Sequence, residues 1–311
     1  MRVLVVGAGA IGGYFGARLA AAGRDVTFLV REGRAKALRD RGLVIRSPVG
    51  DLTLDKPVLI GASDLKSVYD LAIVTCKAYD LSNVIADLKP AIGPQTAILP
   101  LLNGMAHLDA LDDAFGASHV LGGQCFIAST LAEDGTIVHL NDSQSLTFGE
   151  RDGSMSARVQ RISAEFAGTG VPVTASTNIL QAMWSKWVFL ASLAASTCLM
   201  RAPVGAIVAA PGGAEFLLAM VEECRAIADG EGYGPDEDNI QHVRATLTTP
   251  HSPLTASMMR DLSNGGRVEA DHVIGDLIAR GKARTPAVAR PNLELAYMAL
   301  KAYENRRDAS T

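Results

Sequence analysis

The sequence predicts an α/β protein of two domains, a parallel-sheet domain followed by an all-helical one. An apolar strand runs directly into a glycine-rich turn at the N-terminus, strand and helix patterns alternate over the first half, and only helical periodicity remains after residue 175. A chain of 311 residues also exceeds what one hydrophobic core usually holds. We therefore expect domains at residues 1–175 and 176–311.

The first thirty residues predict a dinucleotide-binding turn. The strand Arg2–Val6 leads into a turn and a helix of small residues, and a second apolar strand follows at Val26–Val30. In such a turn the glycines permit the tight bend, let the backbone approach a pyrophosphate, and let the helix pack close to the strand. The helix start then offers unpaired N–H groups to phosphate oxygens. The candidate cofactor-binding residues are Gly7, Ala8, Gly9, Ala10, Ile11 and Gly12. The alternative, a purely structural turn, is disfavoured by this strand–turn–helix context, which predicts a Rossmann-like domain.

The residues after the second strand favour NADP(H) over NAD(H). An NAD site usually carries Asp or Glu here to bond the ribose 2′-hydroxyl. This chain carries Arg31, followed by Glu32 and Arg34. A guanidinium can bind a 2′-phosphate through two parallel charge-assisted hydrogen bonds. Alternatively, Arg31 and Arg34 are a solvated pair at a helix start.

The remaining elements follow in order along the chain. In the first domain we expect a helix over 35–41, a β-hairpin over 42–54, strands over 71–75 and 96–102, helices over 81–91 and 107–115, and extended segments over 120–130, 136–140, 145–148 and 172–174. The early βα units predict a parallel sheet, extended by the antiparallel strands of the later segments. In the second domain we expect helices over 178–200, 212–231, 236–247, 257–261, 269–280 and 292–303, punctuated by prolines.

Two strand ends carry candidate ligand-binding residues, because open parallel sheets bind ligands at the carboxyl ends of their strands. Lys77 follows the strand at 71–75 and could contact the cofactor or stay solvated. Asn103 follows the strand at 96–102. It could hold a lysine or the cofactor ribose, or it could simply form a turn with Gly104.

Lys186 is the candidate proton donor. It lies between Trp184 and Trp187 in an otherwise apolar helical segment. Desolvation there would favour the neutral amine and lower the pKa of Lys186 toward working pH. Reduction of a ketone needs such an acid, because the carbonyl oxygen becomes an alkoxide that must take a proton. The alternative is a surface lysine whose stem covers apolar area.

Taken in order, these pieces resemble the ketopantoate reductase (2-dehydropantoate 2-reductase) family. The resemblance runs from residue 1 to about residue 303 and rests on the glycine turn, Arg31, Thr75-Cys-Lys77-Ala, Asn103-Gly-Met, Trp184-Ser-Lys186, Ser257-Met258 and Glu269-Ala-Asp-His-Val-Ile-Gly275. It implies an NADPH-binding Rossmann-like domain, an all-α domain, and an active site between them. It also implies that Lys186 is the general acid, that Asn103 positions it, that Ser257 bonds the substrate carboxylate, and that Glu269 faces Lys186 and the substrate. The implied reaction reduces 2-dehydropantoate to (R)-pantoate in pantothenate biosynthesis. From the residues alone, Glu269 could instead be a surface charge at a helix start.

One departure from the family concerns substrate choice. Family members usually carry asparagines one and two turns beyond the catalytic lysine, where this chain has Leu190 and Ala194. Because a site without such amides discriminates less for hydroxyl groups, these residues favour a more apolar 2-oxoacid than 2-dehydropantoate. A same-fold reductase for such a substrate and a non-catalytic NADPH-binding sensor both stay open. Arg201, after this helix, could bind a carboxylate or stabilise the helix end.

Composition and histidine spacing argue against other classes of function. A net charge of −4 gives no electrostatic footprint for nucleic acid, and the apolar segment 187–200 is too short to span a membrane. The immediate start of a strand predicts no secretory signal and hence a cytoplasmic protein. No metal is expected, because His107, His139 and His272 lack ligand spacing. His107 could approach the nicotinamide or be a loop histidine without function, and His272 is expected to face a carboxylate or solvent. The resemblance implies a small-molecule 2-oxoacid as the partner, and the apolar segment 178–200 permits a homodimer or a buried core helix.

Overall fold

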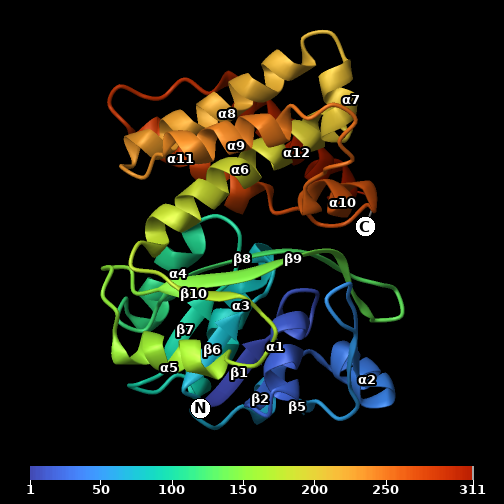
Figure 1. Cartoon of the computed structure of the whole chain (residues 1–311), viewed down its shortest axis with the longest axis vertical. Coiled ribbons are helices and arrows are strands. Elements are labelled where there is room, and N and C mark those ends of the chain that lie inside the picture. Colours follow the sequence, from blue (N-terminus) through green and yellow to red (C-terminus); the bar gives the residue numbers. More distant parts are fainter. Residues whose placement is uncertain (310–311) are drawn as a thin grey trace. The chain divides into compact units, whose positions relative to one another are not determined.

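The computed structural model describes residues 1–309, which form two compact units (Figure 1). The first unit contains Met1–Leu102 and His107–Ile179. The second contains Asn103–Ala106 and the chain from Leu180 onward. The division thus falls after Ile179, where the sequence predicted residue 175. A short loop from the first half of the chain, residues 103–106, is also part of the second unit.

The first unit is organised around a five-stranded parallel sheet with the order β5-β2-β1-β6-β7. Its strands are β1 (Arg2–Val6), β2 (Asp25–Leu29), β5 (Val58–Ile60), β6 (Leu71–Val74) and β7 (Ala97–Pro100). Strand β6 and strand β7 are buried along their whole length, as the apolar composition of parallel strands requires. The chain winds outward from β1 in both directions, so the turn after β1 lies where the strand order reverses. Strand β5 was not predicted, because three residues with an exposed Val58 give little periodic signal.

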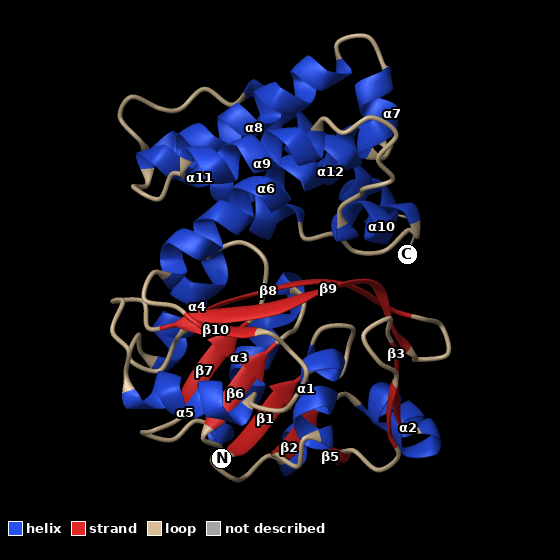
Figure 2. Cartoon of the chain, in the orientation of Figure 1, coloured by secondary structure: helices blue, strands red, loops and turns tan. Residues whose placement is uncertain are grey.

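A second sheet holds the added strands (Figure 2). Its strands are β3 (Leu43–Arg46), β4 (Leu52–Leu54), β8 (Gly122–Leu131), β9 (Ile137–Gly149) and β10 (Val173–Ala175). The order is β10-β9-β3-β4, with β8 paired antiparallel to β9. The predicted hairpin is present as the antiparallel pair β3–β4. The added strands form this mixed sheet instead of lengthening the parallel one, and an isolated bridge joins Ile98 of β7 to Val120.

Helices connect and cover the strands of the first unit. They are α1 (Gly12–Ala21), α2 (Glu32–Arg41), α3 (Leu81–Leu88), α4 (Ala106–Phe115) and α5 (Ala157–Glu165). Helix α1 packs so closely on β2 that a Cβ at Gly16 would lie 2.5 Å from the ring of Phe28. Tyr14 and Phe15 of the same helix are fully buried. This packing places the start of α1 beside the carboxyl end of β1.

The described part of the second unit consists of helices, as predicted. They are α6 (Ile179–Met200), α7 (Val204–Ala209), α8 (Gly213–Gly230), α9 (Glu237–Leu247), α10 (Ser257–Ser263), α11 (Asp276–Ala283) and α12 (Pro291–Asp308). A π-helical segment, Asp271–Gly275, interrupts the helix expected over 269–280. Residues 191–198 of α6 are all buried, so α6 is a core helix. Within residues 1–309, none of the helices combines the length and the apolar run needed to cross a bilayer.

A buried carboxylate caps the start of α12. Glu223 of α8 is 8% exposed and accepts hydrogen bonds from the backbone N–H groups of Asn292 at 3.0 Å and Leu293 at 2.9 Å. The side-chain amide of Asn292 donates a third bond to it at 2.7 Å. The negative charge also lies at the positive end of the helix dipole. Glu223 therefore joins α8 to α12 across the helical unit.

We expect Glu223→Ala to lower the free energy of unfolding by about 2 kcal/mol, because it leaves buried N–H donors without an acceptor. Urea denaturation measures this change. The matched control is Glu222→Ala, since the neighbouring Glu222 is 47% exposed and pairs with Arg244 at the surface. It should change stability by less than about 1 kcal/mol. Equal losses in the two variants would contradict the capping role.

Candidate functional site

The turn after β1 has a backbone that only glycine accommodates. Gly7 has φ +94°, a conformation that other residues rarely adopt. A Cβ at Gly12 would lie 2.1 Å from the carbonyl oxygen of Gly7 and 2.2 Å from Oγ1 of Thr75. Thr75, at the end of β6, donates its hydroxyl to the carbonyl of Val6 at 2.8 Å. The turn is therefore tied to both β1 and β6.

Side chains from other segments hold the carbonyl groups of this turn. Arg34 Nε donates to the carbonyl of Ala8 at 2.9 Å, and Arg34 Nη1 donates to the carbonyl of Gly135 at 3.1 Å. Ser129 donates to the carbonyl of Ala10 at 3.2 Å. Arg34 is half-buried, and burial lowers the pKa of its guanidinium. The alternative that Arg34 belongs to a solvated pair at the helix start is therefore wrong, because this arginine bonds carbonyl groups of the turn and of Gly135.

The same turn leaves room for a bound pyrophosphate. A Cβ at Gly9 would meet no atom within 4 Å, so the turn is open at this point. The residue before α1, Ile11, has no polar side-chain atom to cap the helix start, and although Gly13 N–H donates to the carbonyl of Gly9 at 2.8 Å, N–H groups in the first turn of a helix can lack intrahelical partners. These groups are the donors that bind phosphate oxygens at helix starts. The residues of the turn thus fit a dinucleotide cofactor.

Arg31 and Lys77 lie in the loops after β2 and β6. Arg31 is 72% exposed, and its Nη2 lies 2.9 Å from Oδ1 of Asp80. The hydrogen bond with Asp80 raises the pKa of Arg31 above its ordinary value. Lys77 precedes the short 3-10 helix Ala78–Asp80 and is partly exposed. The contribution of these two residues to cofactor binding stays a prediction.

Lys186 and Asn103 are brought together in the second unit. Lys186 Nζ donates to Oδ1 of Asn103 at 3.2 Å, although the two residues are far apart in the sequence. Lys186 is partly exposed, whereas Trp184 and Trp187 beside it are 2% and 1% exposed. The two indole rings lie 4.8 Å apart. An ammonium group is therefore held by an amide oxygen beside two buried aromatic rings.

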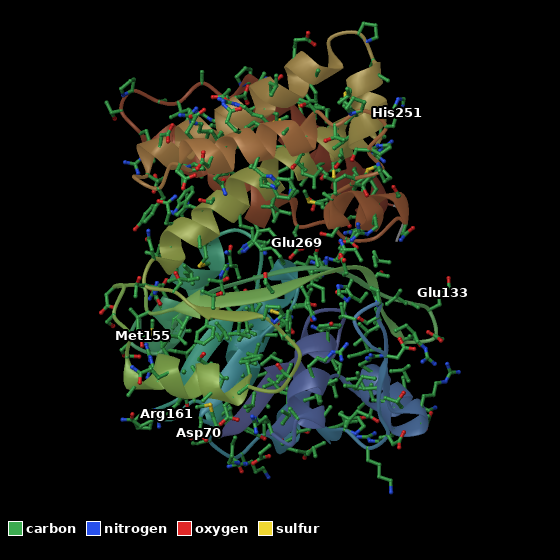
Figure 3. The ribbon with its side chains drawn as sticks, viewed as in Figure 1. Asp70, Glu133, Met155, Arg161, His251 and Glu269 are labelled. Carbon is green, nitrogen blue, oxygen red and sulfur yellow. The ribbon has the colours of Figure 1, made fainter. Side chains whose placement is uncertain are left out.

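The π-helical segment supports the loop that carries Asn103. Gly104 has φ +79°, and a Cβ there would lie 2.9 Å from the carbonyl oxygen of His272. His272 also hydrogen bonds with the backbone of Asn103 and lies near the charge of Glu269. Trp187 Nε1 donates to the carbonyl of Val273 at 2.9 Å. This segment thus contacts both the loop and α6. Figure 3 labels Glu269, which precedes it.

The remaining candidate residues from the sequence lie in the helical unit. Ser257 begins α10 and is partly exposed. Leu190 is partly exposed, whereas Ala194 is 1% exposed. Arg201 has φ +53°, and its guanidinium lies over the ring of Tyr303 at 5.6 Å.

His107 is not the loop histidine that the sequence suggested. It lies in the first turn of α4, which begins at Ala106, and its side chain is fully buried. His272 lies near a carboxylate, as expected, and it also contacts the Asn103 loop. That contact gave no sequence signal, because it depends on residues 103–106 being part of the second unit.

Burial of His272 predicts a pH-dependent stability. Desolvation lowers the pKa of His272 below its ordinary value of 6.5, and the charges of Glu269 and Asp276 oppose this only in part. Between the folded and unfolded pKa values, the unfolded chain binds more protons. The contribution of His272 is therefore lost as the pH falls from above its ordinary pKa of 6.5 toward its lower pKa in the folded protein. We expect the melting temperature to decline less steeply over this range in His272→Asn than in the native protein. His251→Asn, at an exposed site, should keep the native slope, and an identical slope in His272→Asn would contradict the assignment.

Family models match most of the chain. The model described as ketopantoate reductase PanE/ApbA matches residues 3–153, and the model of the C-terminal part of the same family matches residues 178–304. The chain belongs to this family. An uncharacterized oxidoreductase of Bacillus subtilis, YkpB, is 39% identical over 98% of this chain and 99% of its own. A 2-dehydropantoate 2-reductase of Halobacterium salinarum is 28% identical over 93% of this chain and 94% of its own. The crystal structure of the 2-dehydropantoate 2-reductase of Geobacter metallireducens superposes with a TM-score of 0.88 at 27% identity, covering 97% of this chain and 99% of that one.

Membership of the ketopantoate reductase family makes this chain an oxidoreductase that acts on a CH–OH group, with NADP(H) as its cofactor. The family also supports reduction of a small 2-oxoacid. NADPH supplies the hydride for such a reduction. The glycine turn is open at Gly9, and Arg34 and Ser129 hydrogen bond with its carbonyl groups, so the turn fits this cofactor.

Proposed function

We propose that this ketopantoate reductase family member reduces 2-dehydropantoate to (R)-pantoate, a step of pantothenate biosynthesis, with Lys186 as the proton donor. The hydrogen bond from Lys186 Nζ to Asn103 Oδ1 carries the proposal. As the ketone is reduced, negative charge develops on its oxygen, and a positioned ammonium both stabilises that charge and transfers a proton. The amide oxygen of Asn103 accepts one N–H of Lys186 and so fixes the position of the ammonium group.

The other site residues have proposed roles around this donor. Ser257 bonds the substrate carboxylate through its hydroxyl, and Glu269 faces the polar end of the substrate and Lys186. Residues 7–12 hold the pyrophosphate, Arg31 binds the 2′-phosphate, and Lys77 and Asn103 contact the cofactor. Glu269 lies near His272, which itself bonds the backbone of Asn103, and this supports the placement of Glu269 beside the Asn103 loop.

A more apolar 2-oxoacid is the alternative substrate, and Leu190 favours it. Leu190 lies one turn after Lys186 on α6 and is partly exposed, so it presents a hydrocarbon group on the side of the proton donor. Ala194, a further turn along, is buried and offers no polar atom. A pocket bounded in this way has less means of binding the hydroxyl of 2-dehydropantoate.

Oxidation of NADPH with a panel of 2-oxoacids tests the proposed substrate against the alternative one. A higher kcat/KM for 2-dehydropantoate than for aliphatic 2-oxoacids without a hydroxyl supports the proposed substrate, and the reverse order supports the alternative. Leu190→Asn should then raise the preference for 2-dehydropantoate about tenfold, the effect of one added hydrogen bond, whereas Leu190→Met should not. NADPH binding without turnover on any 2-oxoacid would reject both and favour a sensor.

Assembly and location belong to the same proposal. We propose a cytoplasmic homodimer, and the described α12 exposes two large apolar side chains that could pack against a second copy: Leu295 is 47% exposed and Met298 is 61% exposed. Helix α6, which the sequence offered for this contact, is buried over residues 191–198 and exposes Met200 at its end. The molar mass in solution, measured by light scattering, tests the assembly.

A further inference from the structure

An ion pair spans the carboxyl end of β1. Arg31 lies in the loop after β2, and Asp80 lies in the loop after β6. Strand β1 lies between β2 and β6 in the sheet, so the two loops flank the glycine turn on either side (Figure 1). Arg31 Nη2 and Asp80 Oδ1 are 2.9 Å apart. The pair therefore bridges the edge of the sheet at which ligands bind in this fold.

The carboxylate is the better anchored partner of this pair. Its side chain is 23% exposed, against 72% for Arg31. Asp80 ends the 3-10 helix Ala78–Asp80 and directly precedes α3, so its backbone is held on both sides. The charge of Asp87 in α3 also acts on Arg31. The guanidinium that would meet a 2′-phosphate thus already faces acidic groups of the protein.

We propose that Asp80 competes with the 2′-phosphate of NADPH for Arg31 and so lowers the preference for NADPH over NADH. A guanidinium binds a phosphate most strongly through two parallel N–H donors, and Asp80 occupies one edge of that fork. A phosphate beside Arg31 would also be repelled by the carboxylate of Asp80. NADH carries no phosphate at this position, so neither the competition for Arg31 nor the repulsion by Asp80 affects its binding. This inference rests on the proposed role of Arg31 as the ligand of the 2′-phosphate.

The test measures dissociation constants for NADPH and NADH by isothermal titration calorimetry, without substrate. Asp80→Asn keeps the shape of the side chain and removes its charge. We expect it to lower the Kd of NADPH about three- to fivefold, as expected for one exposed ion pair, and to leave the Kd of NADH within about twofold. The matched control is Glu32→Gln, which removes an acidic residue next to Arg31 whose carboxylate pairs with Arg39 at 2.9 Å. It should change neither constant.

Arg31→Ala separates the inference from the proposal on which it rests. It should raise the Kd of NADPH, and adding Asp80→Asn to it should bring a smaller gain than Asp80→Asn brings alone, because only the repulsion of the phosphate by Asp80 is then relieved. If Arg31→Ala weakens NADPH binding while Asp80→Asn leaves the NADPH to NADH ratio unchanged or raises the Kd of NADPH, the competition is refuted and the role of Arg31 survives. If Arg31→Ala leaves NADPH binding unchanged, both are refuted. Circular dichroism and the melting temperature verify that each variant is folded.

Discussion

Replacing Lys186 with Met should lower kcat/KM for reduction of the 2-oxoacid substrate about a thousandfold, the usual contribution of a positioned general acid. The substitution keeps a long apolar stem beside Trp184 and Trp187 and removes the ammonium that bonds Asn103. Without it, the alkoxide that develops on the substrate must take its proton from water. Steady-state kinetics with the best 2-oxoacid of the panel measure this loss.

Two controls make the Lys186 result specific. The Kd of NADPH should stay within about twofold of the native value in Lys186→Met, because the proposed pyrophosphate-binding residues are in the glycine turn. Lys282→Met removes an exposed lysine of α11 that pairs with Glu294, and it should leave kcat/KM unchanged. A loss of less than about tenfold in Lys186→Met would contradict its role as the proton donor.

Gly12→Ala should abolish measurable NADPH binding and destabilise the first unit by about 3 kcal/mol or more, the effect of forcing a side chain into a filled space. Its Cβ would lie 2.1 Å from the carbonyl oxygen of Gly7 and 2.2 Å from Thr75 Oγ1, so the turn, α1 or β6 must shift. Calorimetric titration with NADPH and thermal denaturation measure the two effects.

Two further glycines separate binding from folding. A Cβ at Gly9 would meet no protein atom, so Gly9→Ala should keep native stability while weakening NADPH binding, because its methyl group occupies the open side of the turn. Gly33→Ala, in α2, also meets no atom, so it should leave NADPH binding unchanged and keep or slightly raise stability, because alanine favours a helix more than glycine does. Native affinity in Gly9→Ala would contradict the placement of the pyrophosphate at this turn.

The sequence predicted those parts of the fold whose signal is local. The glycine turn, the hairpin of β3 and β4, and the long helices of the second unit each have a pattern of neighbouring residues that specifies them. Arg34 could not be interpreted in this way, because its role depends on the carbonyls of Ala8 and Gly135, which folding brings to it. Asp80 was missed for the same reason, since its pairing with Arg31 requires β1 to lie between β2 and β6.

The residues of the candidate site could be predicted from the sequence, but the contacts that hold them in place could not. Lys186 and Asn103 were both expected, and their hydrogen bond follows from the loop at residues 103–106 being part of the helical unit. The π-helical segment at Asp271–Gly275 left no periodic signal, because five residues are too few to distinguish it from an ordinary helix. This segment contacts Gly104 and Trp187, and folding alone brings these residues together. The apolar pattern of α6 therefore could not show how the loop at residues 103–106 is held.

The pH dependence of kcat/KM, compared between the native protein and Lys186→Met, tests proton donation by Lys186 most directly. We predict that kcat/KM of the native protein falls at high pH, as the ammonium loses the proton that it delivers, and that the low residual kcat/KM of Lys186→Met lacks this fall. The same high-pH decline in both proteins would show that another group supplies the proton and would contradict the proposed mechanism.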